Sequence, residues 1–104
     1  MIIVTTDFIP GKEIEKVLGM ARGNTVRARA VGKDIMAVLR NMVGGEVTEY
    51  TKMIAESREQ ALDRMAENAK QMGANAVLNV RFGTSMVMTG AAEILAYGTA
   101  VVVR

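Results

Sequence analysis

Residues 40–82 have the sequence RNMVGGEVTEYTKMIAESREQALDRMAENAKQMGANAVLNVRF, and this stretch decides the fold. From about Thr48 to Met72, apolar side chains recur every three or four positions and charged side chains fill the opposite side. This spacing predicts one long amphipathic helix. Gly73 suits the left-handed residue that commonly ends a helix, and Lys70 suits the negative end of the helix dipole. At ~1.5 Å per residue, the helix would be roughly 37 Å long.

Two strands are predicted after this helix. Every second residue in the range 76–82 is apolar, which predicts a strand with one apolar face. Residues 94–103 are apolar on both faces apart from Thr99, and strands of this kind are usually covered on both sides. We therefore expect the last strand to be central, either in one subunit or once subunits join.

The chain before residue 40 also has extended patterns. Residues 2–6 are short and β-branched, which predicts a strand, and Pro10-Gly11 suits the two central positions of a type II turn. Residues 14–21 and 26–30 form two further extended segments, separated by the turn residues 22–24. This arrangement predicts a β-hairpin.

A short helix is predicted between Gly32 and Gly44, where apolar residues again recur at spacings of three and four. The pair Gly44-Gly45 follows it and is either a phosphate-binding loop or a structural joint. Neither a P-loop nor a dinucleotide-binding motif is present. Glu46 and Glu49 would also repel an anion at the start of the next helix. We therefore interpret the glycine pair as a joint between the two helices.

Together these elements predict a single domain, residues 1–104, of the α+β class: an antiparallel sheet with one short and one long helix. A helix about as long as the domain is wide exceeds a sheet of short strands, so part of its apolar stripe needs another chain. Large exposed apolar patches are rare on soluble monomers. We therefore expect a closed, ring-shaped homo-oligomer.

The composition excludes several classes of function. The chain has no cysteine and no histidine, so it lacks thiolate nucleophiles, zinc ribbons and histidine bases. The net charge is +2, and the basic residues lack the interleaved aromatics of a nucleic-acid-binding surface. No basic leader precedes the first apolar run, and no run approaches the ~20 residues of a membrane helix. We expect a cytoplasmic protein with neither nucleic acid nor membrane as its partner.

Five segments carry a resemblance to a known family. They are TTDFIPGKEI, LGMARGNTVRAR, GKDIMAVLRNMVGGEVTEY, GANAVLNVRFGTS and AAEILAYGTAV, between Thr5 and Val101. In order and spacing they resemble the YbjQ-like family. The resemblance implies an α+β subunit, a pentameric ring and a heavy-metal-binding label, with no established reaction. Asn79 departs from it where a small residue, often Gly, is usual, and Gly83 departs where many members have Asp.

The metal label conflicts with the chemistry of this chain. Soft metals select thiolate, thioether and imidazole ligands, and only methionine is available here. Met86 and Met88 form the one tight pair. Their alternation continues the apolar parity of the strand, so we expect them to fill core or interface. Because Gly83 also removes a potential acidic ligand, we predict no heavy-metal site and no cofactor.

Few residues are candidates for a site. Arg40 and Arg81 lie in segments that match the family, and we expect at least one to meet a carboxylate or a ligand at a subunit boundary. Glu46, Glu49 and Glu93 are the acidic candidates for pairing in space. The sequence shows no activating base that would make Ser57 or Ser85 a nucleophile.

Three functions remain open. The first is a structural or small-ligand-binding homo-oligomer, the second a metal-binding protein, and the third an enzyme whose site forms between subunits. A metal protein needs at least three convergent ligands, and an enzyme needs a pocket with titratable groups. A ring-shaped scaffold needs neither, and the absence of a catalytic motif favours it.

Overall fold

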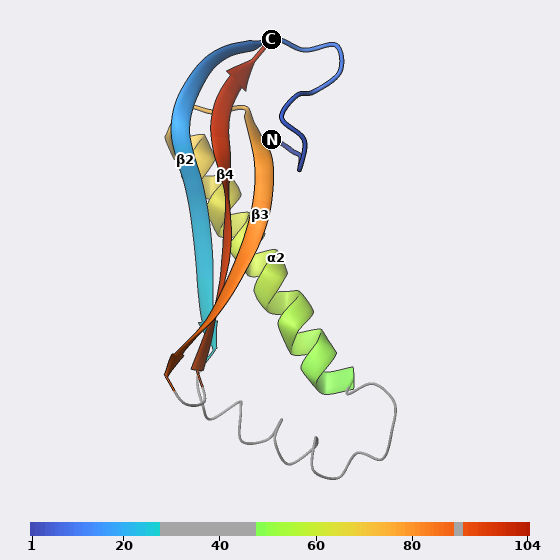
Figure 1. Cartoon of the computed structure of the whole chain (residues 1–104), viewed down its shortest axis with the longest axis vertical. Helices are drawn as coiled ribbons and strands as arrows, with labels where there is room; N and C mark the ends of the chain where they lie inside the picture. Colours follow the sequence, from blue (N-terminus) through green and yellow to red (C-terminus); the bar gives the residue numbers. More distant parts are fainter. Residues whose placement is uncertain (28–47, 89–90) are drawn as a thin grey trace.

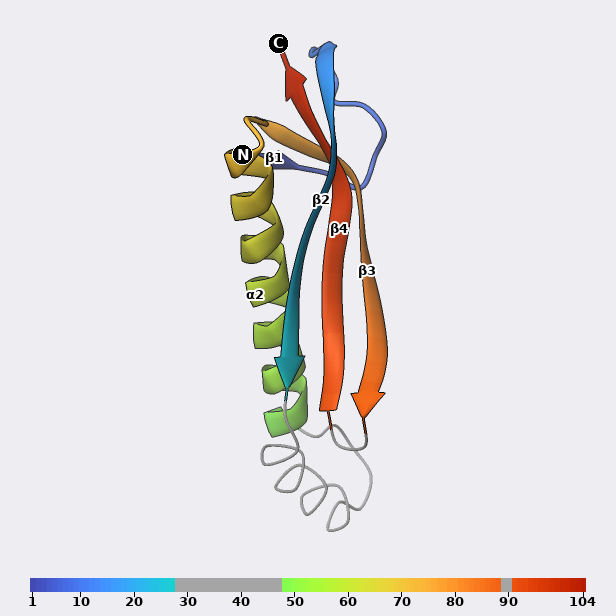
Figure 2. The same ribbon diagram turned by 90° about the vertical axis from the view of Figure 1, so that its left-hand side faces the viewer.

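A computed structural model describes residues 1–27, 48–88 and 91–104 of the chain. Its elements are β1 (Ile2–Ile3), β2 (Ile14–Arg27), α2 (Thr48–Gln71), β3 (Ala76–Met88) and β4 (Ala91–Val103). The strands form one sheet in the order β1-β3-β4-β2, and α2 covers one face of it (Figures 1 and 2). The predicted α+β class is confirmed. The predicted short helix and the Gly44-Gly45 joint lie outside the described residues.

The sheet is mixed, which corrects the prediction of an antiparallel sheet. β4 pairs antiparallel with both β2 and β3, whereas β1 pairs parallel with β3. Parallel neighbours need a long connection, and most of the chain separates β1 from β3. β4 lies between β3 and β2, so the predicted central position of the last strand is confirmed.

The predicted hairpin is wrong, because β2 is one strand of 14 residues that pairs with β4 along its length. Gly23 lies inside this strand, opposite Ala96. A β-carbon at position 23 would stand 2.5 Å from the carbonyl oxygen of Ala61 and would also collide with the backbone of Met65. The glycine therefore allows α2 to approach the sheet closely and does not form a turn.

The predicted helix and its end are confirmed. α2 spans Thr48–Gln71, and Gly73 follows with a φ of +93°. The N–H of Gly73 donates to the carbonyl of Lys70 over 3.0 Å, and the N–H of Ala74 donates to that of Ala69 over 3.0 Å. These bonds satisfy carbonyls at the helix end that have no partner within the helix.

The helix packs along β2 and β4 within this one chain. Ala61, Met65 and Ala69 are fully buried in a cluster with Ala21 and Ala96. The expectation of short strands was wrong: β3 and β4 have 13 residues each, or ~43 Å at 3.3 Å per residue. The 24-residue helix is ~36 Å long by the same kind of estimate. The sheet is therefore long enough to receive the helix, and helix length alone does not require a second chain.

A bulge at Asn79 interrupts the alternation predicted for residues 76–82. Leu78 pairs with Thr99 and Arg81 pairs with Tyr97, so the two residues between them oppose only one residue of β4. Asn79 has a φ of +55°, a conformation that Gly and Asn adopt most readily. As a result Leu78 packs in one apolar cluster and Val80 in the other, so the predicted single apolar face is only partly correct.

The N-terminal segment covers the other face of the sheet at one end. Ile2, Val4 and Ile9 pack on a second cluster, whose buried members are Ala76, Leu78, Val101 and Val103. The predicted turn is confirmed, because Gly11 has a φ of +78° and the N–H of Lys12 donates to the carbonyl of Ile9 over 3.1 Å.

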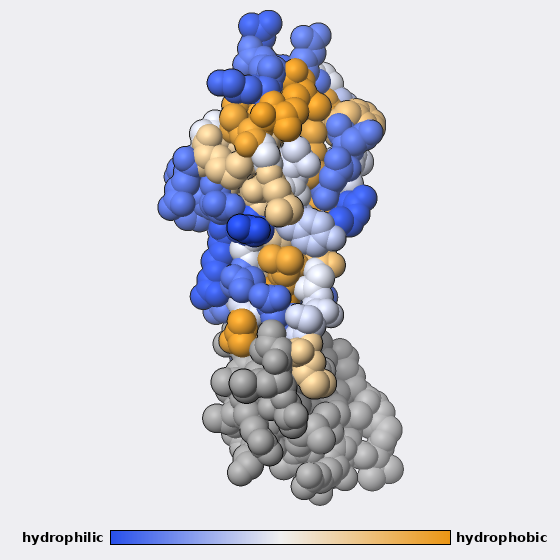
Figure 3. All heavy atoms as spheres, turned by 60° about the vertical axis from the view of Figure 1, so that its left-hand side comes forward, coloured by the Kyte–Doolittle hydropathy of each residue, from blue (hydrophilic) through white to orange (hydrophobic). Residues whose placement is uncertain are grey.

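Apolar side chains remain exposed outside both clusters. Hydrophobic side chains gather near the end of the molecule where β2 begins (Figure 3). Ile14 and Val17 of β2 are 47% and 66% exposed in the single chain. Single apolar residues scattered over a surface are common, but apolar side chains that gather in one place usually mark a site of interaction. This exposure is therefore relevant to the assembly of the protein.

Candidate functional site

The face of the sheet opposite α2, here called the outer face, carries a row of polar residues across β2, β4 and β3. Arg22 pairs with Tyr97 and Tyr97 with Arg81, so the three share one row. Glu93 lies four residues before Tyr97 on β4 and pairs with Ser85 of β3. Directly paired residues point to the same face, so the register gathers these side chains on the outer face.

Glu93 is the centre of a hydrogen-bonded group that joins all three strands. Its Oε2 accepts a hydrogen bond of 2.9 Å from Nδ2 of Asn24, and its Oε1 accepts one of 3.5 Å from Oγ of Ser85. Both carboxylate oxygens are therefore in contact with donors from neighbouring strands. The carboxylate is half-buried and stays accessible to a small molecule.

An open hollow lies beside this group at the β2 edge, with a volume of about 510 Å³. Its lining, which defines what we call the polar hollow, consists of Arg22, Gly23, Asn24, Asn68, Glu93 and Leu95. Asn68 reaches the hollow from α2, where its Oδ1 accepts a hydrogen bond of 3.0 Å from the main-chain N–H of Arg22. The lining thus offers one cation, one carboxylate and two amides to a polar ligand.

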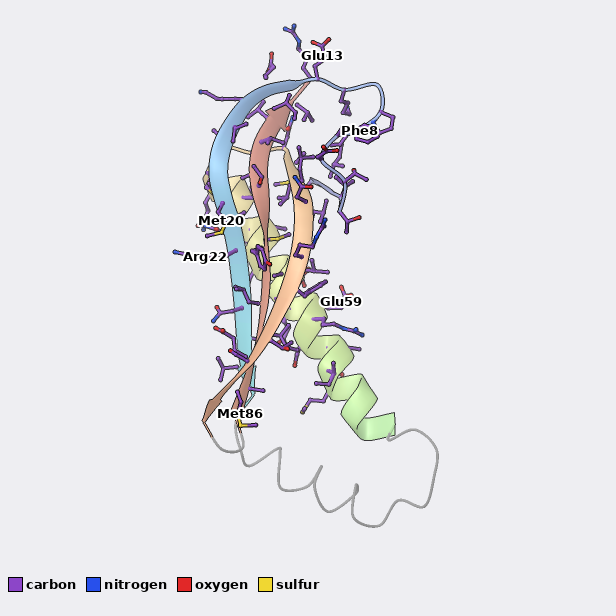
Figure 4. The ribbon with its side chains drawn as sticks, viewed as in Figure 1. Phe8, Glu13, Met20, Arg22, Glu59 and Met86 are labelled. Atoms are coloured by element: carbon purple, nitrogen blue, oxygen red, sulfur yellow. The ribbon has the colours of Figure 1, made fainter. Side chains whose placement is uncertain are left out.

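The two arginines of the row do not converge. The Arg22 side chain points away from the sheet (Figure 4). The Arg81 guanidinium donates from Nη1 to the carbonyls of Thr5 over 3.0 Å and of Val80 over 2.9 Å. Within one chain, Arg81 therefore fastens the N-terminal segment to β3, and a role at a subunit boundary stays a prediction.

The other candidates from the sequence are placed only in part. Arg40 and Glu46 lie outside the described residues. Glu49 lies in the first turn of α2, and its side chain is not among those described. Arg81 and Glu93 belong to rows four residues apart along the sheet, or ~13 Å, so they do not form one site.

Arg22, Asn24 and Asn68 were not predicted from the sequence as site residues. The first two were assigned to a turn, although their alternation with Gly23 also fits a strand. Asn68 lies 46 residues after Arg22, and its contact depends on the docking of α2 on the sheet. No local pattern indicates a contact of this kind.

Metal ligands do not gather in the part of the chain that the structure describes. No three His, Cys, Asp or Glu side chains lie close enough there to hold an ion. Met86 is 78% exposed in the single chain, so it is not a core residue. Met86 pairs with Ala92 and Met88 with Ala91, so the strand register shifts between the two methionines. The prediction that no heavy metal is bound stays a prediction.

The one helix within the described ranges is not apolar enough to cross a bilayer, although its length would suffice. Its exposed side is strongly charged, with Glu56, Glu59 and Asp63 along it. These three side chains line a shallow depression together with Lys52, Ala55 and Gln60. A helix face of this composition is typical of contact with water.

Comparison with known proteins agrees with the fold. A solved structure from Pediococcus pentosaceus, described as a protein of unknown function of the DUF74 family, matches with a TM-score of 0.65 at 14% identity. The match covers 100% of this chain and 98% of that one. At this identity the likeness concerns the fold alone.

Sequence comparison identifies the family. A "UPF0145 protein" of Methanosarcina acetivorans is 69% identical over 101 residues, covering 97% of this chain and 95% of that protein. One of Archaeoglobus fulgidus is 58% identical over 104 residues, covering 100% and 96%. The YbjQ family profile, described as "Putative heavy-metal-binding", matches residues 1–104. With its whole length matched by this profile and by close relatives, the chain belongs to the YbjQ family.

Proposed function

We propose that the protein is a homo-oligomeric binding protein whose subunits associate through surfaces left exposed in the single chain. One observation carries this proposal. Large apolar side chains lie exposed on the single chain at several of its described residues, which soluble monomers rarely gather on their surface.

The exposed apolar side chains support association. Phe8, Val17, Met20 and Met86 are all more than half exposed in the single chain. Phe8 lies in the N-terminal segment, Val17 and Met20 lie on β2, and Met86 lies on β3. A ring provides two different contact surfaces on each subunit and leaves neither unpaired. The resemblance noted in the sequence supplies the number five, and the absence of cysteine fits a cytoplasmic location.

The oligomeric state is tested by light scattering coupled to size-exclusion chromatography at micromolar concentration. A mass of five subunits supports the full proposal. A closed oligomer of another size would overturn the number five and leave self-association standing. A stable monomer across the whole concentration range would overturn the proposal.

The polar hollow supports a second part of the function, the binding of a small polar molecule. Glu93 and Asn24 are held by the hydrogen bond between them, so their free lone pairs and donors have fixed directions. Pre-set polar groups lose little entropy on binding. Native mass spectrometry of the purified protein, compared with a Glu93→Gln variant, tests this. An adduct on the wild type that is weakened in the variant supports the hollow, and an adduct retained equally by both places the ligand elsewhere.

The family description names heavy metals, and we do not extend it to this chain. Zinc and divalent copper are bound mainly by Cys and His in proteins, and the sequence contains neither. An enzyme with a site between subunits remains the alternative. Among the acidic site candidates named from the sequence, Glu93 is the one that the described residues place in the polar hollow. For catalysis, a neighbouring subunit would have to bring a second reactive group to Glu93.

A further inference from the structure

The polar hollow extends over three neighbouring rows of paired residues on the outer face. In order along β2 and β4, the rows are Arg22 with Tyr97, Asn24 with Leu95, and Val26 with Glu93. Residues on one face of a strand repeat every two positions, so the first and last rows stand ~13 Å apart at 3.3 Å per residue. Arg22 in the first row and Glu93 in the last both line the hollow. The hollow therefore has a positive charge at one end and a negative charge at the other.

The end of the hollow at Arg22 offers hydrogen-bond donors. Among the described residues, the Arg22 guanidinium has no hydrogen-bond or ion-pair partner, and the side chain projects away from the sheet (Figure 4). Asn68 of α2 lines the same end. Its Oδ1 is occupied by the main-chain N–H of Arg22, so the group that it can offer a ligand is the Nδ2 amide. A guanidinium and an amide that both donate are suited to a carboxylate.

The end of the hollow at Glu93 offers hydrogen-bond acceptors. Each carboxylate oxygen accepts one hydrogen bond, from Asn24 over 2.9 Å and from Ser85 over 3.5 Å. A carboxylate can accept about four hydrogen bonds in all, so acceptor positions remain for a ligand. Within the described ranges Glu93 forms no ion pair, although its side chain is partly buried. A primary ammonium group on a ligand would supply both the counter-charge and the donors.

An apolar surface lies between the two charged ends. Leu95 belongs to the middle row, lines the hollow and is partly exposed. On its other side Leu95 pairs with Gly83 of β3, which has no side chain to cover it. A β-carbon at Gly83 would meet no atom within 4 Å in the described part of the chain. Methylene groups of a ligand can therefore lie over Leu95, where removal of apolar surface from water favours binding.

The helix α2 holds the β2 side of the hollow in place. Asn68 accepts the hydrogen bond of the Arg22 N–H, and Nη1 of Arg64 donates to the carbonyl of Asn24 over 2.5 Å. Between these two bonds, Gly23 packs directly against the helix backbone. Three successive residues that line the hollow therefore have fixed main-chain positions. A site that is formed before the ligand arrives loses little entropy on binding.

We propose that the polar hollow binds a small zwitterion whose two charges are separated by an apolar spacer, with its carboxylate at Arg22 and its ammonium at Glu93. This rests on the proposed binding of a small polar molecule and names the chemical class of that molecule. Glu93 would repel a simple anion, and Arg22 would repel a simple cation. A neutral sugar would leave both charges unpaired. An α-amino acid with an uncharged side chain has its two charges too close together to reach both ends of the hollow.

The first experiment compares four probes on the wild-type protein by ligand-observed NMR titration. ε-Aminocaproate has an ammonium and a carboxylate at opposite ends of an apolar chain, and norleucine is its isomer with both charges at one end. Caproate and n-hexylamine have one charge each. We expect ε-aminocaproate to bind about tenfold or more tightly than each of the other three, because it alone makes both charge-assisted contacts. Equal or tighter binding of norleucine or of a single-charge probe would overturn the inference.

The second experiment assigns each charge of the ligand to one residue. Glu93→Gln is expected to abolish the tighter binding of ε-aminocaproate relative to caproate, and Arg22→Gln its tighter binding relative to n-hexylamine. Arg58→Gln is the matched control, because it removes a positive charge at an exposed position of α2 that does not line the hollow. It should leave the order and the strength of binding of all four probes unchanged.

The results also separate this inference from the proposed function. Suppose that the purified protein carries an adduct that Glu93→Gln weakens, but that ε-aminocaproate binds no better than the single-charge probes. The zwitterion would then be wrong, and the hollow would still bind a polar molecule. If Glu93→Gln retains the adduct, and ε-aminocaproate binds equally to the wild type and to both hollow variants, the ligand lies elsewhere and both proposals fail.

Discussion

Gly23 of β2 lies so close to α2 that a β-carbon on it would stand 2.5 Å from the carbonyl oxygen of Ala61. This contact joins the edge of the sheet to the middle of the helix, where Ala61 and Met65 are fully buried. Three atoms of helix backbone surround the position, and backbone yields less than a flexible side chain. The distance between helix and sheet is therefore set by the absence of a side chain at residue 23.

Gly23→Ala is expected to destabilise the protein by about 2 kcal/mol or more, since overpacking a well-filled site usually costs ~1–3 kcal/mol. The measurement is the free energy of unfolding in urea at one fixed protein concentration, because association would otherwise shift it. Gly83→Ala is the control, since a β-carbon at Gly83 would meet open space in the described part of the chain. Equal effects of the two substitutions would contradict the close packing of helix and sheet.

Asn79 has a φ of +55° at the bulge of β3, and its side chain is exposed. Asn79→Gly is expected to keep the fold at nearly the wild-type stability, whereas Asn79→Val should lose roughly 1–2 kcal/mol, because a β-branched residue is strained in this conformation. Urea unfolding of both variants under matched conditions measures the difference. If valine were tolerated as well as glycine, the left-handed backbone at residue 79 would not be a constraint on the fold.

The features predicted correctly from the sequence are those with local causes. The helix, its end at Gly73 and the turn at Pro10-Gly11 each follow from residues a few positions apart. Gly23 was misassigned to a turn because glycine also marks close packing, and its partner Ala61 lies 38 positions away in the chain. The bulge at Asn79 was missed because one asparagine in an apolar strand does not by itself indicate a change of register.

In the candidate site, too, local features could be predicted from the sequence and contacts between distant residues could not. Glu93 could be named from the sequence because carboxylates are few in the C-terminal third of the chain. Its bonded neighbours Asn24 and Ser85 follow only from the register of three strands. Asn68 follows only from the position of α2 on the sheet. Contacts that depend on the packing of distant elements could not be derived from spacing along the chain.

The metal prediction is directly measurable. We expect protein purified without an affinity tag and dialysed against metal-free buffer to retain well under one equivalent of zinc or copper per subunit. The reason is that the chain has neither Cys nor His, and thioether sulfur alone favours cuprous copper. Elemental analysis by mass spectrometry gives the stoichiometry. About one equivalent of either metal would contradict the prediction, and Met86→Leu would then show whether that sulfur is a ligand.

Arg81 connects the N-terminal segment to β3, and the last prediction concerns this connection. Its Nη1 donates to the carbonyl of Thr5, and the adjacent backbone bond runs from the N–H of Asn79 to the carbonyl of Thr6. Arg81→Met keeps much of the side-chain bulk and removes the donors. Since the guanidinium is exposed, we expect a loss of only about 0.5–1.5 kcal/mol in the free energy of unfolding.

In Arg81→Met, hydrogen exchange of the amides that hold the N-terminal segment should change more than the free energy of unfolding of the whole protein. This comparison distinguishes a residue that fastens the segment from one with a general effect on the surface. In Arg81→Met, hydrogen exchange is expected to accelerate at the amides of Val4 and Asn79, whose bonds hold the N-terminal segment to β3, while the amides of α2 keep their wild-type rates. Arg58→Met, at an exposed position of the helix, is the matched control and should change neither set. If Arg81→Met instead lowers the mass of the oligomer with the exchange of Val4 unchanged, Arg81 acts at a subunit boundary and the fastening role is wrong.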